Sequence, residues 1–335
     1  MELLLPTEAE RRRRFVPTLS SVAKRLKHSM WLAMVCGLAG VASAAPERPE
    51  ILGIAHVALY VHDLAQSRAF YKDFLGFDEP FSLPNRDGSL RLTWIKINDR
   101  QAIELFPEKA PKTDRLYQVS FQVSDAEMMR QYLASKGIAV PDTLPLGKSG
   151  TANFMIKDPD GHNVEFVQYL PESWTAKDYG HHLPETRVSV RMPHVGIMVR
   201  HLDATMAFYR DLLGFTETWR GSKNGHTLSW VNLKVPNGND YLELMLYGDD
   251  SQLARRTTMH HICLEVPDVF ATQKLLASRA LPPGSKAPTP PATGVNGRRQ
   301  INYYDPDTTR IEVMEPKTVS GQPVPPSKAP PPGDQ

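Results

Sequence analysis

The sequence predicts an α+β protein of two tandem domains, each formed by two paired βαβββ modules that make one curved eight-stranded sheet. Three observations lead to this fold class. The chain has 335 residues, 41% hydrophobic and 23% charged, which suits a globular protein longer than one typical domain. A long strand-and-helix motif occurs twice, and a shorter one recurs once inside each copy.

The first segment of the chain, residues 1–45, is expected to be an export leader. Met30 to Ala45 is apolar, follows basic residues at Lys24–His28 and ends in the small-x-small cleavage pattern Ala42-Ser43-Ala44. The apolar run is shorter than the roughly 20 residues that span a membrane. We therefore expect cleavage and export to the periplasm or the medium, and a membrane-anchored protein if the leader is kept.

The charge balance argues against some classes of partner. The formal net charge is +2, but residues 1–44 hold seven basic and three acidic residues, which leaves 39 − 7 = 32 basic and 37 − 3 = 34 acidic residues. A body with a net charge of −2 gives no case for nucleic acid or an anionic membrane as a partner. Cys263 is the one thiol outside the leader, so no internal disulfide is expected. A homodimer is left open.

The long repeat defines two domains. His56–Val61 (HVALYV) and Ala69–Phe77 (AFYKDFLGF) return as His194–Val199 (HVGIMV) and Ala207–Phe215 (AFYRDLLGF), an offset of 194 − 56 = 138 residues. Each copy reads as an apolar strand, a short helix with apolar residues at helical spacing, a glycine stop and further strands. We place domain 1 at residues 51–171 and domain 2 at residues 190–316.

Local signals support the elements within each copy. Asp63 with Gln66 is typical of a capping box at the start of the first helix. The half-repeat places a strand and a helix in the second half of each domain, at 118–125 and 126–137, and again at 261–268 and 269–280. The final strand of each domain follows an Asp-Pro-Asp turn, at 158–160 and 305–307. Whether modules pair within or across domains stays open.

The end of the chain, residues 317–335, is Pro-rich and has little apolar content to bury. We expect this tail to be disordered and solvated. A second Pro-rich stretch, Leu281–Gly297, lies inside the fourth module and could frame a substrate.

Residues of metal-ligand type recur at equivalent positions of the four modules. They are His56, Glu104, Gln118 and Glu165 in domain 1, and His194, Glu243, His261 and Glu312 in domain 2. Each glutamate sits between apolar residues of a strand, where a carboxylate is costly to bury unless it is paired or bound to a cation. A single such residue would be read as an outward-facing one, but eight matching positions predict a metal site. The prediction is firmer for domain 2, since Gln118 is a neutral and weaker ligand than histidine.

The phrases HVALYV…DLAQSRAFYKDFLGF, HVGIMVRHLDATMAFYRDLLGF and HHICLEV, with the two DPD turns, resemble the vicinal oxygen chelate superfamily across about residues 51–316. Members with similar motifs include glyoxalase I, extradiol dioxygenases, methylmalonyl-CoA epimerase and fosfomycin or bleomycin resistance proteins. The resemblance implies glyoxalase-like domains with one divalent metal ion (Ni, Zn, Co, Mn or Fe(II)) per active domain, which a small-molecule substrate chelates.

The reaction that the resemblance favours is glyoxalase I-like isomerase or lyase chemistry, in which a proton is abstracted next to a metal-chelated oxygen. Two histidines and two glutamates resemble the ligand set of bacterial glyoxalase I. In that family a ligating glutamate leaves the metal and carries the proton. Matched by position, Glu312 is the first choice for this catalytic role and Glu243 the second.

Two other functions remain open. His194, His261 and Glu312 would also suit an Fe(II) extradiol ring-cleaving dioxygenase, although Asn302 and Asp240 stand where that family has a tyrosine and a histidine. A non-catalytic protein that binds small molecules of the antibiotic type is the third. Aromatic residues that could serve such a cleft, if they are not core residues, are Trp94, Trp219, Trp230, Tyr303 and Tyr304. Export argues against substrates built on cytoplasmic thiol cofactors.

Overall fold

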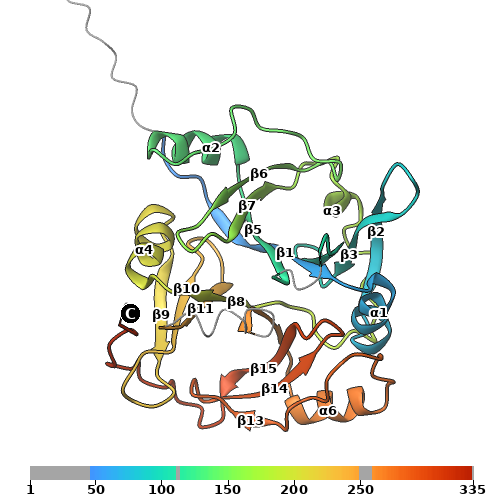
Figure 1. Ribbon diagram of the computed structural model, residues 1–335, viewed down its shortest axis with the longest axis vertical. Helices are drawn as coiled ribbons and strands as arrows, with labels where there is room; N and C mark the ends of the chain where they lie inside the picture. Colours follow the sequence, from blue (N-terminus) through green and yellow to red (C-terminus); the bar gives the residue numbers. More distant parts are fainter. Residues whose placement is uncertain (1–45, 111–113, 249–258, 334–335) are drawn as a thin grey trace, which may run out of the picture. The chain divides into compact units, whose positions relative to one another are not determined.

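Figure 1 shows the computed structural model of the chain, which describes residues 46–110, 114–248 and 259–333. The expected leader falls outside these residues. Both expected domains belong to one compact unit, Ala45–Gln335. Within the described residues, no helix is both apolar enough and long enough to cross a membrane.

Domain 1 is one mixed sheet with the strand order β2-β3-β4-β1-β5-β7-β6. Its strands are β1 (Ile51–Val61), β2 (Asp78–Pro84), β3 (Leu90–Lys96), β4 (Ala102–Pro107), β5 (Leu116–Val123), β6 (Ala152–Lys157) and β7 (Asn163–Gln168). The helical segments are α1 (Leu64–Arg68), η1 (Ala69–Phe74), α2 (Ala126–Ser135) and α3 (Trp174–Lys177). β1 and β5 pair antiparallel and join the first module to the second, so the modules pair within the domain.

Domain 2 repeats this topology with the strand order β13-β14-β15-β12-β8-β11-β10-β9. Its strands are β8 (His194–Val199), β9 (Thr216–Gly221), β10 (Trp230–Lys234), β11 (Tyr241–Leu246), β12 (His261–Glu265), β13 (Ala292–Thr293), β14 (Arg298–Tyr304) and β15 (Arg310–Thr318). The described helical segments are α4 (Leu202–Met206), η2 (Ala207–Leu212) and α6 (Val269–Ala277). β8 and β12 pair antiparallel at the junction of the two modules.

The sheet of domain 1 has seven strands instead of the expected eight. The stretch between α2 and β6 makes only an isolated bridge, from Leu146 to Ala152. Pro141 and Pro145 lie in this stretch, and proline has no N–H to donate to a sheet ladder. In domain 2 the matching strand, β13, is two residues long. The strand that follows the helix of the second module is therefore short or missing in both domains.

The first helix of domain 1 begins as the sequence indicates. The Asp63 carboxylate accepts hydrogen bonds from the backbone N–H groups of Ala65 and Gln66. The Gln66 side chain donates to that same carboxylate at 3.1 Å, and so the reciprocal half of a capping box is replaced by a side-chain contact. α1 then continues as a π-helical turn, η1, and α4 continues in the same way as η2.

These two π-helical turns hold the domains together. The Tyr71 hydroxyl in η1 donates to Asp305 of the second domain at 3.0 Å, and the Tyr209 hydroxyl in η2 donates to Asp158 of the first domain at 3.1 Å. All four residues are buried. The aspartates open the two Asp-Pro-Asp turns, so each turn receives a tyrosine from the other domain. Burial, with the charge of Asp307, raises the pKa of the Asp305 carboxyl to about 7.

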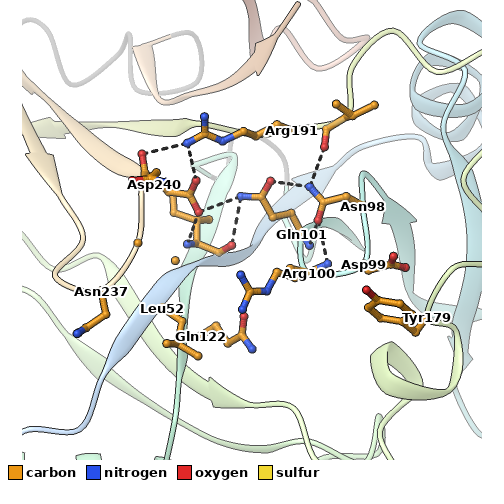
Figure 2. A pocket seen from close by; sticks show the side chains of 15 residues that line it. Leu52, Asn98, Asp99, Arg100, Gln101, Gln122, Tyr179, Arg191, Asn237 and Asp240 are labelled. Atoms are coloured by element: carbon orange, nitrogen blue, oxygen red, sulfur yellow. Dashed lines mark hydrogen bonds and ion pairs between the residues drawn. The ribbon is translucent and has the colours of Figure 1, made fainter. Parts of the chain in front are cut away.

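A second junction between the domains surrounds Gln101 (Figure 2). Its side-chain nitrogen donates to the Met192 carbonyl at 2.9 Å and to Asp240 at 3.2 Å, and its oxygen accepts from the Met192 N–H. Asp240 also accepts from the Ile54 N–H and pairs with Arg191. Gln101, Asp240, Ile54 and Arg191 all line an open cavity of about 970 Å³. Asp240 thus links the domains and lies outside the predicted ligand sets.

The tail follows a defined course up to residue 333, unlike the expected disorder. β15 runs to Thr318, past the expected boundary at residue 316. The Ser327 N–H donates to the Arg220 carbonyl of β9 at 2.9 Å, and the Leu228 N–H donates to the Pro330 carbonyl at 2.7 Å. The tail therefore lies against domain 2, where edge strand β9 and the loop before β10 exchange backbone hydrogen bonds with it.

Candidate metal centre

Strand register brings the four ligand candidates of domain 2 onto one face of its sheet. His194 of β8 pairs with Cys263 of β12, which pairs with Glu312 of β15. In the next row, Gly196 of β8 pairs with both His261 and Glu243. Residues two apart on a strand share a face, so the two rows point their side chains the same way.

The four side chains converge on a common point. Each offers one ligand atom, and these atoms lie within 4.8 Å of one another. His194 Nε2 lies 3.1 Å from His261 Nε2 and 3.1 Å from a Glu312 carboxylate oxygen. His261 Nε2 lies 3.3 Å from Glu243 and 3.4 Å from Glu312. All four residues are buried.

The charges of this cluster fit a divalent cation. Burial acts to raise the pKa of the Glu312 carboxyl, but hydrogen bonds and charge from His194 and His261 outweigh it and hold that pKa well below its usual value. The pKa of Glu243 is also lowered, because contacts with the same imidazoles outweigh its burial. Two buried carboxylates and two imidazoles make a neutral site with an M²⁺ ion, whereas two buried anions are costly without a cation. The donor set could therefore hold a metal.

Two groups contact the outer ring nitrogen of His261. Its Nδ1 lies 3.0 Å from the Met259 carbonyl, which can only accept a hydrogen bond, and close to the Arg310 guanidinium, which can only donate one, while Nε2 faces the cluster. Burial and the Arg310 guanidinium, 2.6 Å from the same Nδ1, act to lower the pKa of His261, but Glu243 and Glu312 outweigh them and raise it. The His194 ring packs against Tyr241, with the ring centroids 4.6 Å apart.

Gly196 makes room for His261. A Cβ atom built on Gly196 would overlap the His261 ring. The equivalent residue of domain 1 is Ala58, which pairs with Gln118. A glycine on the central strand of one domain therefore permits an imidazole across from it, and the alanine of the other domain stands opposite a carboxamide.

The four candidates of domain 1 are also brought together, but as a closed hydrogen-bond network. His56 Nε2 lies 2.8 Å from Glu165 and 3.6 Å from Glu104. The Gln118 side-chain nitrogen donates to Glu165 at 2.9 Å. The Ser120 hydroxyl donates to Glu165 at 2.6 Å and lies 2.8 Å from His56 Nε2. In this orientation Gln118 presents its amide nitrogen, which has no lone pair for a metal, whereas its oxygen would be the ligand atom.

Electrostatics also separates the two clusters. Burial raises the pKa of the Glu104 carboxyl to about 7, although the charge of His56 opposes the shift. Glutamates 243 and 312 of domain 2 have lowered pKa values. Among the described residues, the one group of three or more His, Cys, Asp or Glu side chains with ligand atoms this close is that of domain 2.

Three residues that the sequence did not single out as ligands shape these sites. Ser120 completes the network of domain 1, Cys263 holds the matching position in domain 2, and Gly196 leaves space for His261. Alignment of the two copies of the repeat could have identified these positions, because HVALYV against HVGIMV pairs Ala58 with Gly196, and QVS against HIC pairs Ser120 with Cys263. Of the aromatic candidates, Trp219 lines a cavity with Tyr241, whereas Tyr303 is buried against Phe74.

Comparison with known proteins gives partial sequence matches to an epimerase. The chain is 33% identical to mouse mitochondrial methylmalonyl-CoA epimerase over 90 residues, and 36% identical to the human protein over 90 residues. These matches cover 24% of this chain and 48% and 49% of the two epimerases. The matched stretch thus spans about half the length of these relatives.

Solved structures match most of the chain. A mutant of homoprotocatechuate 2,3-dioxygenase from Brevibacterium fuscum has a TM-score of 0.60 at 20% identity, covering 81% of this chain and 73% of that one. An Mn(II)-bound glyoxalase from Novosphingobium aromaticivorans has a TM-score of 0.61 at 16% identity, covering 83% and 85%. Both share the fold.

A family model matches each domain separately, at residues 53–166 and 191–313, which together make up more than half of the chain. The matched ranges contain the long repeat and all eight ligand candidates. The chain belongs to the Glyoxalase/Bleomycin resistance protein/Dioxygenase superfamily.

Proposed function

We propose that this protein is a metal-dependent enzyme whose domain 2 performs glyoxalase I-like isomerase or lyase chemistry on a small molecule. The observation that carries the proposal is the convergence of two imidazoles and two carboxylates, all buried, within 4.8 Å. The retained fourth ligand, Glu243, favours proton transfer, since a two-histidine, one-carboxylate site needs no second glutamate.

The residues of the site have distinct roles in this proposal. His194, His261, Glu243 and Glu312 would hold a divalent ion, for which Ni, Zn, Co, Mn and Fe(II) are candidates, and the ion would polarise a substrate oxygen. One glutamate takes the proton from the adjacent carbon. Glu312 is the first choice by position in the sequence. Glu243 touches one imidazole where Glu312 touches two, so it has fewer contacts to give up when it turns toward a substrate.

The reaction class can be tested with the purified protein. The bound metal is identified first, and the enzyme is then assayed with a hemithioacetal under anaerobic conditions and with a catechol in the presence of oxygen. Anaerobic turnover with Ni, Co or Zn supports the proposal. Fe(II) with oxygen consumption on the catechol would overturn it. Glu243→Gln and Glu312→Gln then identify the base, since loss of turnover with metal retained marks the proton carrier.

Fe(II) extradiol ring cleavage is the second candidate. His194, His261 and Glu312 form a mutually close triad, with contacts of 3.1–3.4 Å. Two observations weigh against it. Asp240 stands where the dioxygenase family has a histidine, and it is engaged in the junction between the domains. Asn302, which pairs with Glu312 from the next strand, offers an amide where that family has a tyrosine.

We also propose that the protein is exported, on the strength of the apolar leader and its Ala42-Ser43-Ala44 site. Mass spectrometry of the mature protein from a native host would identify its N-terminus. A chain that starts near residue 45 supports export with cleavage, and an intact leader in the membrane fraction points to the anchored form.

A further inference from the structure

Beside the candidate metal centre lies a cavity of about 430 Å³. Tyr241, whose ring packs on His194, forms part of its wall, and so does Asn232, which pairs with Glu243 in the sheet. The four ligand candidates do not themselves line the cavity, which is separated from the cluster by these side chains of β10 and β11. Pro323 and Val324 of the tail line it as well, so the C-terminal segment encloses the space next to the site.

The charged side chains around this cavity are mainly cationic. Arg191, Lys234 and Arg298 line it, against one acidic residue, Glu265. Glu265 and Asp240 both contact Arg191. Arg298 is partly buried and makes no ion pair with a carboxylate within the described part of the chain. A partly buried guanidinium without an anion is a binding group for one.

The metal centre does not compensate the positive charge around the cavity. With an M²⁺ ion, Glu243 and Glu312 bring the cluster to neutrality. With Asp240, which pairs with Arg191 from outside the lining, counted alongside Glu265, the groups around the cavity keep a formal charge of 3 − 2 = +1. Two lining polar atoms, Trp219 Nε1 and Asn232 Oδ1, are buried without a hydrogen-bond partner. Buried polar atoms are normally satisfied, so these two positions suit groups on a ligand.

We propose that the substrate of this centre is an organic acid: a small molecule with two adjacent oxygens for the metal and a separate carboxylate held by Arg298, with Lys234 nearby. The Trp219 N–H and the Asn232 carbonyl provide a further donor and acceptor along the same wall. This inference rests on the proposed function, because it assumes that the substrate chelates an ion at the cluster.

A pair of probes tests the substrate class without turnover. Succinic monohydroxamate carries a chelating oxygen pair and a distal carboxylate, and its terminal amide is a neutral molecule of the same shape. Calorimetric titration of the metal-loaded full chain should show that the acid binds at least about tenfold more tightly, as expected for one charge-assisted hydrogen bond in a cavity. Added salt should narrow the difference.

Variants locate the carboxylate site. Arg298→Gln should reduce the preference for the acid to less than about threefold while amide binding and metal content are unchanged. Arg299→Gln is the matched control. The Arg299 side chain, next in sequence, packs over Phe270 and lies 3.5 Å from Glu315, so this variant should keep the full preference for the acid. Lys234→Met should give an intermediate loss.

The outcomes separate the two proposals. Equal binding of acid and amide, or a preference that survives Arg298→Gln, overturns the substrate class and leaves the metal-dependent function standing. If neither hydroxamate binds to protein that contains stoichiometric metal, the chelation on which the proposed function depends is absent, and both proposals fall.

Discussion

The two domains carry four candidate residues at equivalent positions of the same sheet topology. In domain 2 these residues bring together only imidazole nitrogens and carboxylate oxygens, whereas in domain 1 an amide nitrogen and a hydroxyl group take part. In domain 2, His194 and His261 face Glu243 and Glu312 with their ring nitrogens 3.1 Å apart. In domain 1, His56 lies 2.8 Å from Glu165, and an amide nitrogen and a hydroxyl group donate to the same carboxylate. The comparison shows that the buried carboxylate of Glu165 is satisfied by hydrogen-bond donors, whereas the carboxylates of domain 2 face two imidazoles.

Three paired positions account for the difference. Gln118 replaces His261, Ser120 replaces Cys263, and Ala58 replaces Gly196. The Ala58/Gly196 pair limits the Gln118/His261 pair. A Cβ atom at the position of Gly196 would occupy the volume of the His261 imidazole. A histidine at position 118 of domain 1 therefore also requires a glycine at position 58.

The largest effect is expected from His261→Gln, which gives domain 2 the residue of domain 1. Loss of a direct ligand should lower metal affinity by more than about 100-fold, the upper range for second-shell changes. Elemental analysis of the dialysed protein measures this. His56→Gln is the matched control and should leave the metal content unchanged. If His56→Gln instead empties the protein of metal, the assignment of the two sites is reversed.

The reverse conversion should create a second site. The triple variant Ala58→Gly, Gln118→His, Ser120→Cys removes the competing donors and supplies an imidazole with space above the strand. We expect an additional ion per chain in calorimetric titration. Gln118→His without Ala58→Gly should bind no additional ion, because the alanine Cβ occupies the space that the ring needs. Equal binding by the single and triple variants would refute the role of residue 58.

Gly196→Ala should have a smaller effect, since it displaces a ligand without deleting it. Overlap with the His261 ring moves the imidazole, and a misplaced ligand costs about 10- to 100-fold in metal affinity. Competition with a chromophoric chelator measures the change. Ala58→Gly is the control in the other domain and should leave affinity as it is. Full affinity in Gly196→Ala would show that the sheet relaxes around the added methyl group.

A separate effect, on stability and not on metal affinity, concerns pH and the Tyr–Asp contacts between the domains. The pKa of Asp305 is raised to about 7 from the usual 3.8, so its contribution to stability is complete below about pH 4 and is lost as pH rises through 7. At 1.36 kcal/mol per unit, the loss is at most about 4 kcal/mol.

Urea unfolding of metal-free protein at pH 5 and pH 8 measures this linkage. Asp305→Asn should show a smaller fall in unfolding free energy between the two pH values than the wild type. Asp158→Asn, in which an amide oxygen replaces the carboxylate as acceptor of the equivalent tyrosine hydrogen bond, is the matched control. Identical pH dependence in wild type and Asp305→Asn would disprove the assigned role of that carboxyl.

The sequence by itself determined the repeat, the modules, the family and the eight candidate positions, because strand alternation, helix caps and turn residues are local signals. Tertiary structure decided which cluster presents free ligand atoms. Ser120 and Gly196 act across neighbouring strands, and their partners are defined only by strand register. It also decided that domain 1 has seven strands, that Tyr71 and Tyr209 cross to the opposite domain, and that the tail encloses the cavity. Those contacts join residues far apart in the chain, and only the folded packing selects them.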